Sequence, residues 1–417
     1  MRRRVATGLW LVLVVALACF AGEAKLQDGD LVAVTGDSIT EQKQYSVFIE
    51  DYLLMCQPAA KLRVMQFGWG GETAGGFRNR MANDCLPFKP TVATTCYGMN
   101  DGGYRPFDEN QQGRSYREST RAIVQEFKKA GVRLIVVGSP GVVDADTFRH
   151  DPAAARMYNE TLARLRDIAR EVAEKEGVVF GNVFDPMMDA MTKAKAKYGK
   201  DYHVAGGDGV HPGANGQLLM AYAFLKALGC DGNIGTITVD LAAGKAEATE
   251  GHKVLACKDG AVELESTRYP FCFFGDPKDP NATSGIIEFV PFNQDLNRLT
   301  LVVKGARGDR VKVTWGKASK EFAAADLAKG VNLAAELLDN PFCDAFKKVD
   351  AAVRAQQNFE TPMIKDLINK LPSMQRLVPE EKEAFERVRT ALARRNQELF
   401  DAAAAAVVPV KHAIKIE

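Results

Sequence analysis

The stretch Val32-Ala-Val-Thr-Gly-Asp-Ser-Ile-Thr40 changes from an apolar run to a polar turn at Gly36. Its apolar part has the length and the β-branched content of a buried strand. Ser38 then stands where a strand ends and a helix begins, either as a helix cap or as a nucleophile at the edge of a sheet. Because an unassisted hydroxyl is a poor nucleophile, the second interpretation requires a base, an orienting acid and an oxyanion hole from elsewhere in the chain.

Similar apolar runs recur through the first half of the chain and alternate with segments of helical spacing. The runs are rich in Val, Ile, Thr and Phe and lie at 31–35, 62–67, 91–97, 133–138 and 178–183. Helical spacing is clearest at 115–130, 153–176 and 215–228. This alternation predicts a three-layer, flavodoxin-like α/β fold, in which a parallel sheet carries helices on both faces. Ligands of such folds bind beyond the carboxyl ends of the strands.

The pattern of predicted elements changes after residue 230. Short strand-like runs separated by Gly, Asp, Asn and Pro lie at 235–240, 253–256, 261–265, 285–290, 299–304 and 312–315. Helical patterns follow at 323–329, 334–338, 341–357, 362–371 and 380–406. We therefore predict an α/β domain over 25–230, a small antiparallel β accessory unit over 231–317 and a helical C-terminal region over 318–417.

The first 24 residues have the organisation of a secretory signal peptide. Three arginines precede an apolar run from Leu9 to Phe20, and small residues follow as far as Ala24. That run is shorter than the ~20 residues of a membrane-spanning helix. We expect an exported protein, periplasmic or extracellular, without an integral membrane span. Lipid anchoring through Cys19 is the less favoured alternative, because Leu17 is atypical of a lipobox.

The net charge and the cysteines limit the binding partners and the disulfides that can be expected. The formal net charge is +1, so the chain has no large basic field that would attract nucleic acid. Beyond the signal peptide lie seven cysteines, at positions 56, 85, 96, 230, 257, 272 and 343, and none forms a C-x-x-C pair. Both a local Cys257–Cys272 disulfide and buried free thiols remain open.

Three further stretches supply polar groups at the ends of predicted elements. They are Phe67-Gly-Trp-Gly-Gly-Glu-Thr73, Tyr97-Gly-Met-Asn-Asp101 and Gly207-Asp-Gly-Val-His-Pro212. The first two follow predicted strands and the third precedes the last helix of the α/β domain. In a parallel sheet these loops converge on the edge where Ser38 lies.

Together the four stretches resemble the SGNH hydrolases, also called GDSL-type esterases, over residues 25–230. The four residues that give that family its name are matched by Ser38, Gly71, Asn100 and His211. Phe67 departs from the family pattern, which often has Asn there. The resemblance implies an esterase domain, and four ordered blocks are far more specific than any one of them.

The roles of these residues follow from the chemistry of acyl transfer. His211 accepts the proton of Ser38 and returns one to the leaving alcohol, while Asp208 fixes the tautomer of the imidazole. The N–H groups of Ser38 and Gly71 and the amide of Asn100 form the predicted oxyanion hole. The remaining histidines, at 150, 203, 252 and 412, have no partner at ligand spacing. No metal and no organic cofactor is therefore expected.

Aromatic residues near these loops bear on the substrate. Trp69, Tyr97, Tyr104 and Phe107 lie in or beside them. We assign Trp69 and Tyr104 to substrate binding, because aromatic rings stack on sugars, although packing is the commoner role of such residues. Asp101 is interpreted as structural, orienting the Asn100 loop.

The resulting hypothesis is a secreted serine esterase that hydrolyses O-acyl, chiefly O-acetyl, esters of a small-molecule or polysaccharide carbohydrate through an acyl-enzyme. A lipolytic esterase or lysophospholipase is the first alternative, since the same site serves both. The alternative of another class is a non-catalytic surface protein whose β unit binds glycan.

Overall fold

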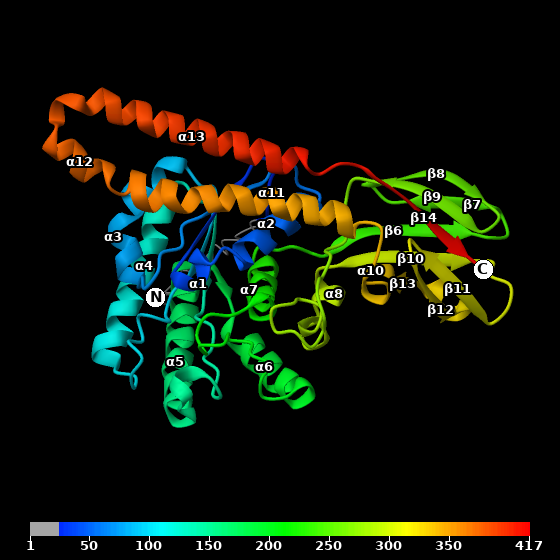
Figure 1. The fold of residues 1–417 in the computed structure, drawn as a ribbon, viewed down its shortest axis with the longest axis horizontal. Coiled ribbons are helices and arrows are strands. Elements are labelled where there is room, and N and C mark those ends of the chain that lie inside the picture. Colours follow the sequence, from blue (N-terminus) through cyan, green and yellow to red (C-terminus); the bar gives the residue numbers. More distant parts are fainter. Residues whose placement is uncertain (1–24) are drawn as a thin grey trace, which may run out of the picture.

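The computed structural model describes residues 25–417. The predicted signal peptide and Cys19 lie outside the described residues. Figure 1 shows an α/β part beside a β-rich part, with the long helices α11 (Cys343–Pro362) and α13 (Lys382–Ala405) running side by side above the α/β part. Within residues 25–417, no helix combines the length and the apolar character needed to cross a bilayer.

A five-stranded, fully parallel sheet of order β2-β1-β3-β4-β5 forms the centre of the α/β part. Its strands are β1 (Leu31–Gly36), β2 (Arg63–Gln66), β3 (Val92–Cys96), β4 (Leu134–Gly138) and β5 (Val179–Gly181). The predicted parallel sheet is confirmed, each strand lying at a predicted apolar run. The strand order reverses beside β1, so the crevice beyond β1 and β3 is where such a sheet binds ligands.

Helices cover both faces of this sheet. They are α1 (Ser38–Glu41), α2 (Tyr45–Met55), α3 (Ala74–Asp84), α4 (Arg114–Lys129), α5 (Pro152–Glu176), α6 (Phe184–Tyr198) and α7 (Ala214–Ala227). Side chains of α2, α6 and α7 pack with Val32 and Val34 on one face, and those of α3 and α4 with Ala33 on the other. Helix α5 contributes to both layers. The alternation of neighbouring strand residues between the two layers is the period of a pleated strand.

The accessory unit consists of two sheets, of order β13-β10-β6-β7 and β12-β11-β14-β9-β8. The strands are β6 (Asn233–Asp240), β7 (Lys245–Ala248), β8 (His252–Lys258), β9 (Ala261–Ser266), β10 (Arg298–Lys304), β11 (Arg310–Trp315), β12 (Ala318–Ala323), β13 (Val331–Asn332) and β14 (Val410–Ile416). Most pairs in the two sheets are antiparallel, as the sequence predicts, but β6 and β10 pair in parallel, so the first sheet is mixed.

Two local predictions in this part of the chain are wrong. The run at 285–290 forms no strand but contains a turn of 3-10 helix, Ile286–Glu288. Ile286 and Val290 are both buried, and a spacing of four residues suits one helical turn as well as a short apolar run. The C-terminal region, 318–417, is not wholly helical, because it contains β12 and β13 as well as β14, which pairs with β9 and β11.

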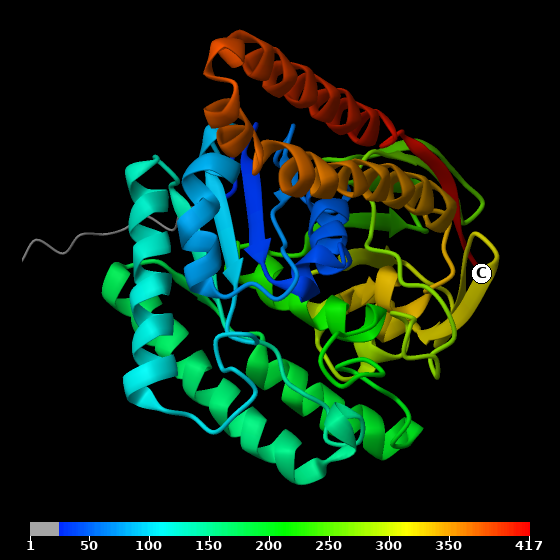
Figure 2. The same cartoon turned by 60° about the vertical axis from the view of Figure 1, so that its left-hand side comes forward.

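The C-terminal helices lie against the α/β part (Figure 2). These are α11, α13, the π-helical turn η5 (Met363–Ile368) and α12 (Leu371–Leu377), whereas α9 (Ala324–Lys329) and α10 (Leu333–Glu336) pack against β10 of the accessory unit, and α8 (Phe292–Asp295) lies earlier in the chain. Gln357 of α11 donates a hydrogen bond to Glu50 of α2 (2.7 Å), and Gln356 donates to the carbonyl of Val64 in β2 (2.9 Å). Buried polar pairing therefore fixes α11 to the central sheet.

A buried chain of hydrogen bonds joins the two accessory sheets. Trp315 Nε1 donates to His412 Nδ1 (3.1 Å), so the proton of the neutral imidazole lies on Nε2 and is donated to Ser266 Oγ (2.9 Å). The Ser266 hydroxyl donates to His252 Nδ1 (2.8 Å), whose Nε2 donates to the carbonyl of Ile234 (3.0 Å). Every hydrogen-bond donor and acceptor in this series has a partner only while both histidines are neutral.

This series of hydrogen bonds makes the free energy of unfolding depend on pH. Burial lowers the pKa of His412 from 6.5 to about 4, so between these values the unfolded state binds more protons than the folded state. The contribution of His412 to the free energy of unfolding is therefore expected to rise with pH across that interval, by at most about 1.4 kcal/mol per pH unit. Urea unfolding at pH 4.5 and 6.5 measures the slope, which should shrink in His412→Phe. An equal slope in wild type and variant would contradict the assignment.

Candidate active site

Ser38 lies immediately beyond the carboxyl end of β1. The side chain of Asp37 accepts a hydrogen bond from the N–H of Ile39 (3.0 Å) and caps α1. The capping role considered for Ser38 therefore belongs to Asp37, and Ser38 is the first residue of the helix, half-exposed. Burial raises the pKa of Asp37 to about 7, and its hydrogen bond to Ile39 gives it the role of a turn residue.

Three side chains from two loops form a hydrogen-bonded line. Ser38 Oγ lies 2.8 Å from His211 Nε2, and His211 Nδ1 lies 2.6 Å from Asp208 Oδ2. The other carboxylate oxygen of Asp208 accepts the N–H groups of Val210 and His211, each at 2.9 Å. Burial acts to raise the pKa of Asp208, but the hydrogen bonds from His211 outweigh it and hold the pKa below its usual value. An ionised Asp208 fixes the tautomer in which His211 Nε2 can accept the serine proton.

The two other predicted anion-hole residues lie on neighbouring loops. Gly71 has φ of 72°, a conformation that favours glycine. The amide of Asn100 donates to the carbonyl of Glu72 (3.0 Å), and Tyr104 Oη donates to Asn100 Oδ1 (3.3 Å). These two contacts orient the amide, and its second N–H is used by no hydrogen bond within the described residues.

The side chain of Asp101 links the loop that carries Asn100 to the end of the loop that carries Gly71. Its carboxylate accepts the N–H of Gly98 (3.0 Å) in its own loop and that of Ala74 (3.0 Å) at the start of α3. Burial raises the pKa of Asp101 to about 7. The contacts agree with the structural role predicted for this residue, since they set the separation of the loops that carry Gly71 and Asn100.

The two residues assigned to substrate binding also make contacts within the protein. The Tyr104 ring stacks on Tyr158 with centroids 4.9 Å apart. Arg80 Cζ lies 4.8 Å and Lys365 Nζ 4.9 Å from the centroid of the Trp69 ring. Both aromatic residues are half-exposed, so their contact with substrate stays a prediction.

Removing the Tyr104 hydroxyl tests its support of Asn100. Tyr104→Phe keeps the stacked ring but leaves the Asn100 carbonyl oxygen without that donor. We expect kcat for 4-nitrophenyl acetate to fall about 3–10-fold with KM nearly unchanged, because an oriented donor acts on the transition state. An increase in KM alone would instead support a substrate-binding role for the hydroxyl.

Sequence reasoning missed a buried ion pair behind the glycine loop. Arg80 Nε lies 2.6 Å from Glu72 Oε1, and Arg80 also donates to the carbonyl of Phe67 (2.6 Å). The Phe67 side chain is buried beside Phe88, which explains the departure from the family pattern. The pairing partners are eight residues apart in sequence and carry no motif that would have revealed them.

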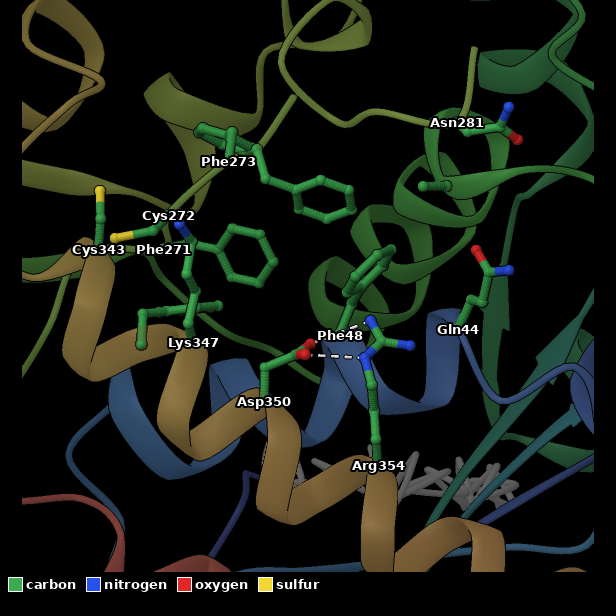
Figure 3. A pocket seen from close by; sticks show the side chains of 13 residues that line it. Gln44, Phe48, Phe271, Cys272, Phe273, Asn281, Cys343, Lys347, Asp350 and Arg354 are labelled. Carbon is green, nitrogen blue, oxygen red and sulfur yellow. Dashed lines mark hydrogen bonds and ion pairs between the residues drawn. The ribbon is translucent and has the colours of Figure 1, made fainter. Parts of the chain in front are cut away.

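A cavity of about 460 Å³ lies between α2, the segment 271–281 and α11 (Figure 3). Phenylalanine dominates its lining, with Phe48, Phe271, Phe273, Phe274 and Phe346 among the walls. Ala214, three residues beyond His211 in sequence, also lines the cavity, as do the charged side chains of Lys347, Asp350 and Arg354. The predicted catalytic and oxyanion-hole residues are not among its lining residues.

Two cysteines line the same cavity. All seven described cysteines are free, so the local Cys257–Cys272 disulfide is absent. Cys272 instead lies beside Cys343 of α11 (Figure 3), and a hydrogen bond between the two thiols lowers the pKa of Cys343 to about 7. Among the described residues, no cluster of three His, Cys, Asp or Glu side chains is placed to hold a metal ion.

Comparison with known proteins adds three findings. Residues 34–219 match the model of the GDSL-like lipase/acylhydrolase family. An acetylxylan esterase from Geobacillus stearothermophilus is 22% identical over 229 residues, covering 49% of this chain and 96% of the esterase. The structure of a gut microbial diltiazem-metabolizing enzyme is 23% identical, covers 94% of this chain and 99% of its own, and has a TM-score of 0.72. That last likeness shows that the whole fold, accessory sheets and C-terminal helices included, is shared.

Proposed function

Through residues 34–219 this chain belongs to the GDSL-like lipase/acylhydrolase family and is a carboxylic-ester hydrolase, and from this premise we propose that it is an exported serine esterase that removes O-acetyl groups from carbohydrate. The observation that carries the mechanism is the line from Ser38 through His211 to Asp208, with separations of 2.8 and 2.6 Å.

In the proposed mechanism His211 Nε2 takes the proton of Ser38 as Oγ bonds to the acyl carbon. The oxyanion that forms is stabilised by the N–H groups of Ser38 and Gly71 and by the amide of Asn100. The ester C–O bond then breaks, and the leaving alcohol oxygen receives the proton from His211. Water attacks the acyl-enzyme, gives its proton to His211 and releases carboxylate, and Ser38 regains its proton.

Two observations support a carbohydrate acetate as substrate. The relative that aligns with 49% of this chain at 22% identity is named an acetylxylan esterase. Trp69 and Tyr104 are half-exposed beside Gly71 and Asn100 in the chain, and aromatic rings there offer faces for a sugar.

One observation favours the lipolytic alternative. The phenylalanine-lined cavity of about 460 Å³, which Ala214 also lines, is large enough for part of an acyl chain. For the non-catalytic alternative, a glycan-binding surface protein, the complete set of Ser38, Asp208 and His211 would have no use.

The substrate class is tested by comparing esters that differ in acyl-chain length and esters that differ in the alcohol. The proposal predicts that kcat/KM for 4-nitrophenyl acetate exceeds that for the butyrate at least tenfold, and that acetate is released from acetylated xylo-oligosaccharide but fatty acid is not released from lysophosphatidylcholine. Ser38→Ala provides the blank for each assay. Preference for butyrate or for the lysophospholipid would overturn carbohydrate deacetylation in favour of the lipolytic reading.

A further inference from the structure

The C-terminal helical region reaches the loop that carries Gly71. The side chain of Gln66, at the end of β2, accepts the N–H of Gly68 (3.0 Å) and donates to Thr361 Oγ1 (2.6 Å). The backbone N–H of Gln66 donates to Glu360 (2.9 Å). Two residues at the end of α11 therefore hold the start of this loop, 294 or more positions away in sequence.

A second contact holds the middle of the loop. Glu41, at the end of the short helix that Ser38 begins, accepts the N–H of Gly70 on Oε2 (2.5 Å). Its other oxygen, Oε1, accepts from Lys365 Nζ (2.5 Å) in the turn η5. Because Gly70 directly precedes Gly71, the carboxylate bridges the C-terminal region and the predicted oxyanion donor.

The Trp69 side chain completes this contact. Lys365 Nζ lies 4.9 Å from the ring centroid and Arg80 Cζ lies 4.8 Å from it. Two cations on an aromatic ring disfavour other side-chain orientations, since each contact is attractive. The loop also packs without space against α1, because a Cβ at Gly68 would lie 2.3 Å from the Glu41 nitrogen.

The geometry points to Lys365 as a positioning residue for the oxyanion hole: through Glu41 and Trp69 it holds the Gly70–Gly71 backbone in the orientation that the transition state requires. This inference rests on the proposed function. It gives the C-terminal helical region a catalytic purpose, because Lys365, Thr361 and Glu360 all come from it. A charge-assisted hydrogen bond is well suited to such a role, since it is stronger than a neutral one.

The test compares Lys365→Met with wild type and with Lys370→Met. Methionine keeps the length of the side chain without the charge, and Lys370 is an exposed lysine of the same region whose side chain, within residues 25–417, pairs only with Asp366. We expect Lys365→Met to lower kcat for 4-nitrophenyl acetate about tenfold, with KM within about twofold of wild type, because a small displacement of a catalytic group lowers the rate steeply. Lys370→Met should match wild type, and Lys365→Arg should recover activity to within about threefold of wild type.

A transition-state analogue separates positioning from simple support of the fold. The ketone 1,1,1-trifluoro-4-phenylbutan-2-one forms a hemiketal with a serine nucleophile, and its oxyanion occupies the hole. Its inhibition constant should rise in Lys365→Met by the same factor by which kcat/KM falls. Unchanged kcat, or a lowered kcat with unchanged inhibitor affinity, would overturn the inference.

A double-mutant cycle tests the route through Glu41. If Lys365 acts through that carboxylate, adding Lys365→Met to Glu41→Gln lowers kcat little further, whereas independent roles give losses that multiply. Thermal denaturation checks whether Lys365→Met folds. If it does not, the inhibition constant is measured on Glu41→Gln and Lys365→Arg instead. The proposed function is judged separately: it fails if wild type and Ser38→Ala hydrolyse the ester equally, whatever Lys365 does.

Discussion

The Ser38→Ala enzyme is expected to lose about 10⁵–10⁶-fold in kcat towards 4-nitrophenyl acetate, because no acyl-enzyme can form without the hydroxyl. Among the described side chains, the hydroxyl forms a hydrogen bond only with the imidazole of His211. Its removal should therefore leave the melting temperature within a few degrees of wild type. Steady-state kinetics and thermal denaturation measure both quantities.

Ser115→Ala is the matched control for this change. Ser115 is exposed on α4, and its replacement should leave kcat unchanged. Mass spectrometry after reaction with diethyl 4-nitrophenyl phosphate should find the label on Ser38 in wild type. More than about 1% residual activity in Ser38→Ala, or a label on another serine, would show that Ser38 is not the nucleophile.

The Asp208→Asn enzyme is expected to lose about 10³–10⁴-fold in kcat with little change in KM. Asparagine preserves the size of the side chain but removes the charge that stabilises the imidazolium, and it permits the unproductive tautomer of His211. Asp208 is 55% exposed, so solvent replaces part of the lost stabilisation, and we expect a smaller loss than for Ser38→Ala.

Asp201→Asn provides the control for Asp208. Asp201 is exposed in the segment just before the same loop and should be replaceable without effect on kcat. Equal activity of the Asp208→Asn variant and wild type would show that another group orients His211.

Most of the candidate site could be predicted from the sequence because each of its blocks is local. Asp208 and His211 are three residues apart on one loop, and Ser38 lies two residues beyond a strand that begins with four apolar residues, Leu31 to Val34. A parallel sheet then brings the blocks to one edge without further information. In the structure, two hydrogen bonds join Ser38, His211 and Asp208, and their catalytic roles stay a prediction.

The sequence by itself therefore determined the parallel α/β sheet, its covering helices and the grouping of the catalytic candidates, since all three depend on short-range apolar patterns and on spacing along the chain. Only the tertiary structure decided that β14 completes a sheet begun more than 140 residues earlier at β9, that Cys272 lies beside Cys343, and that Lys365 reaches Glu41 from 324 positions away. The physical reason is that such contacts join single side chains or unpaired strand edges from distant segments. Their partners are chosen by the packing of the whole chain, and no local pattern records that choice.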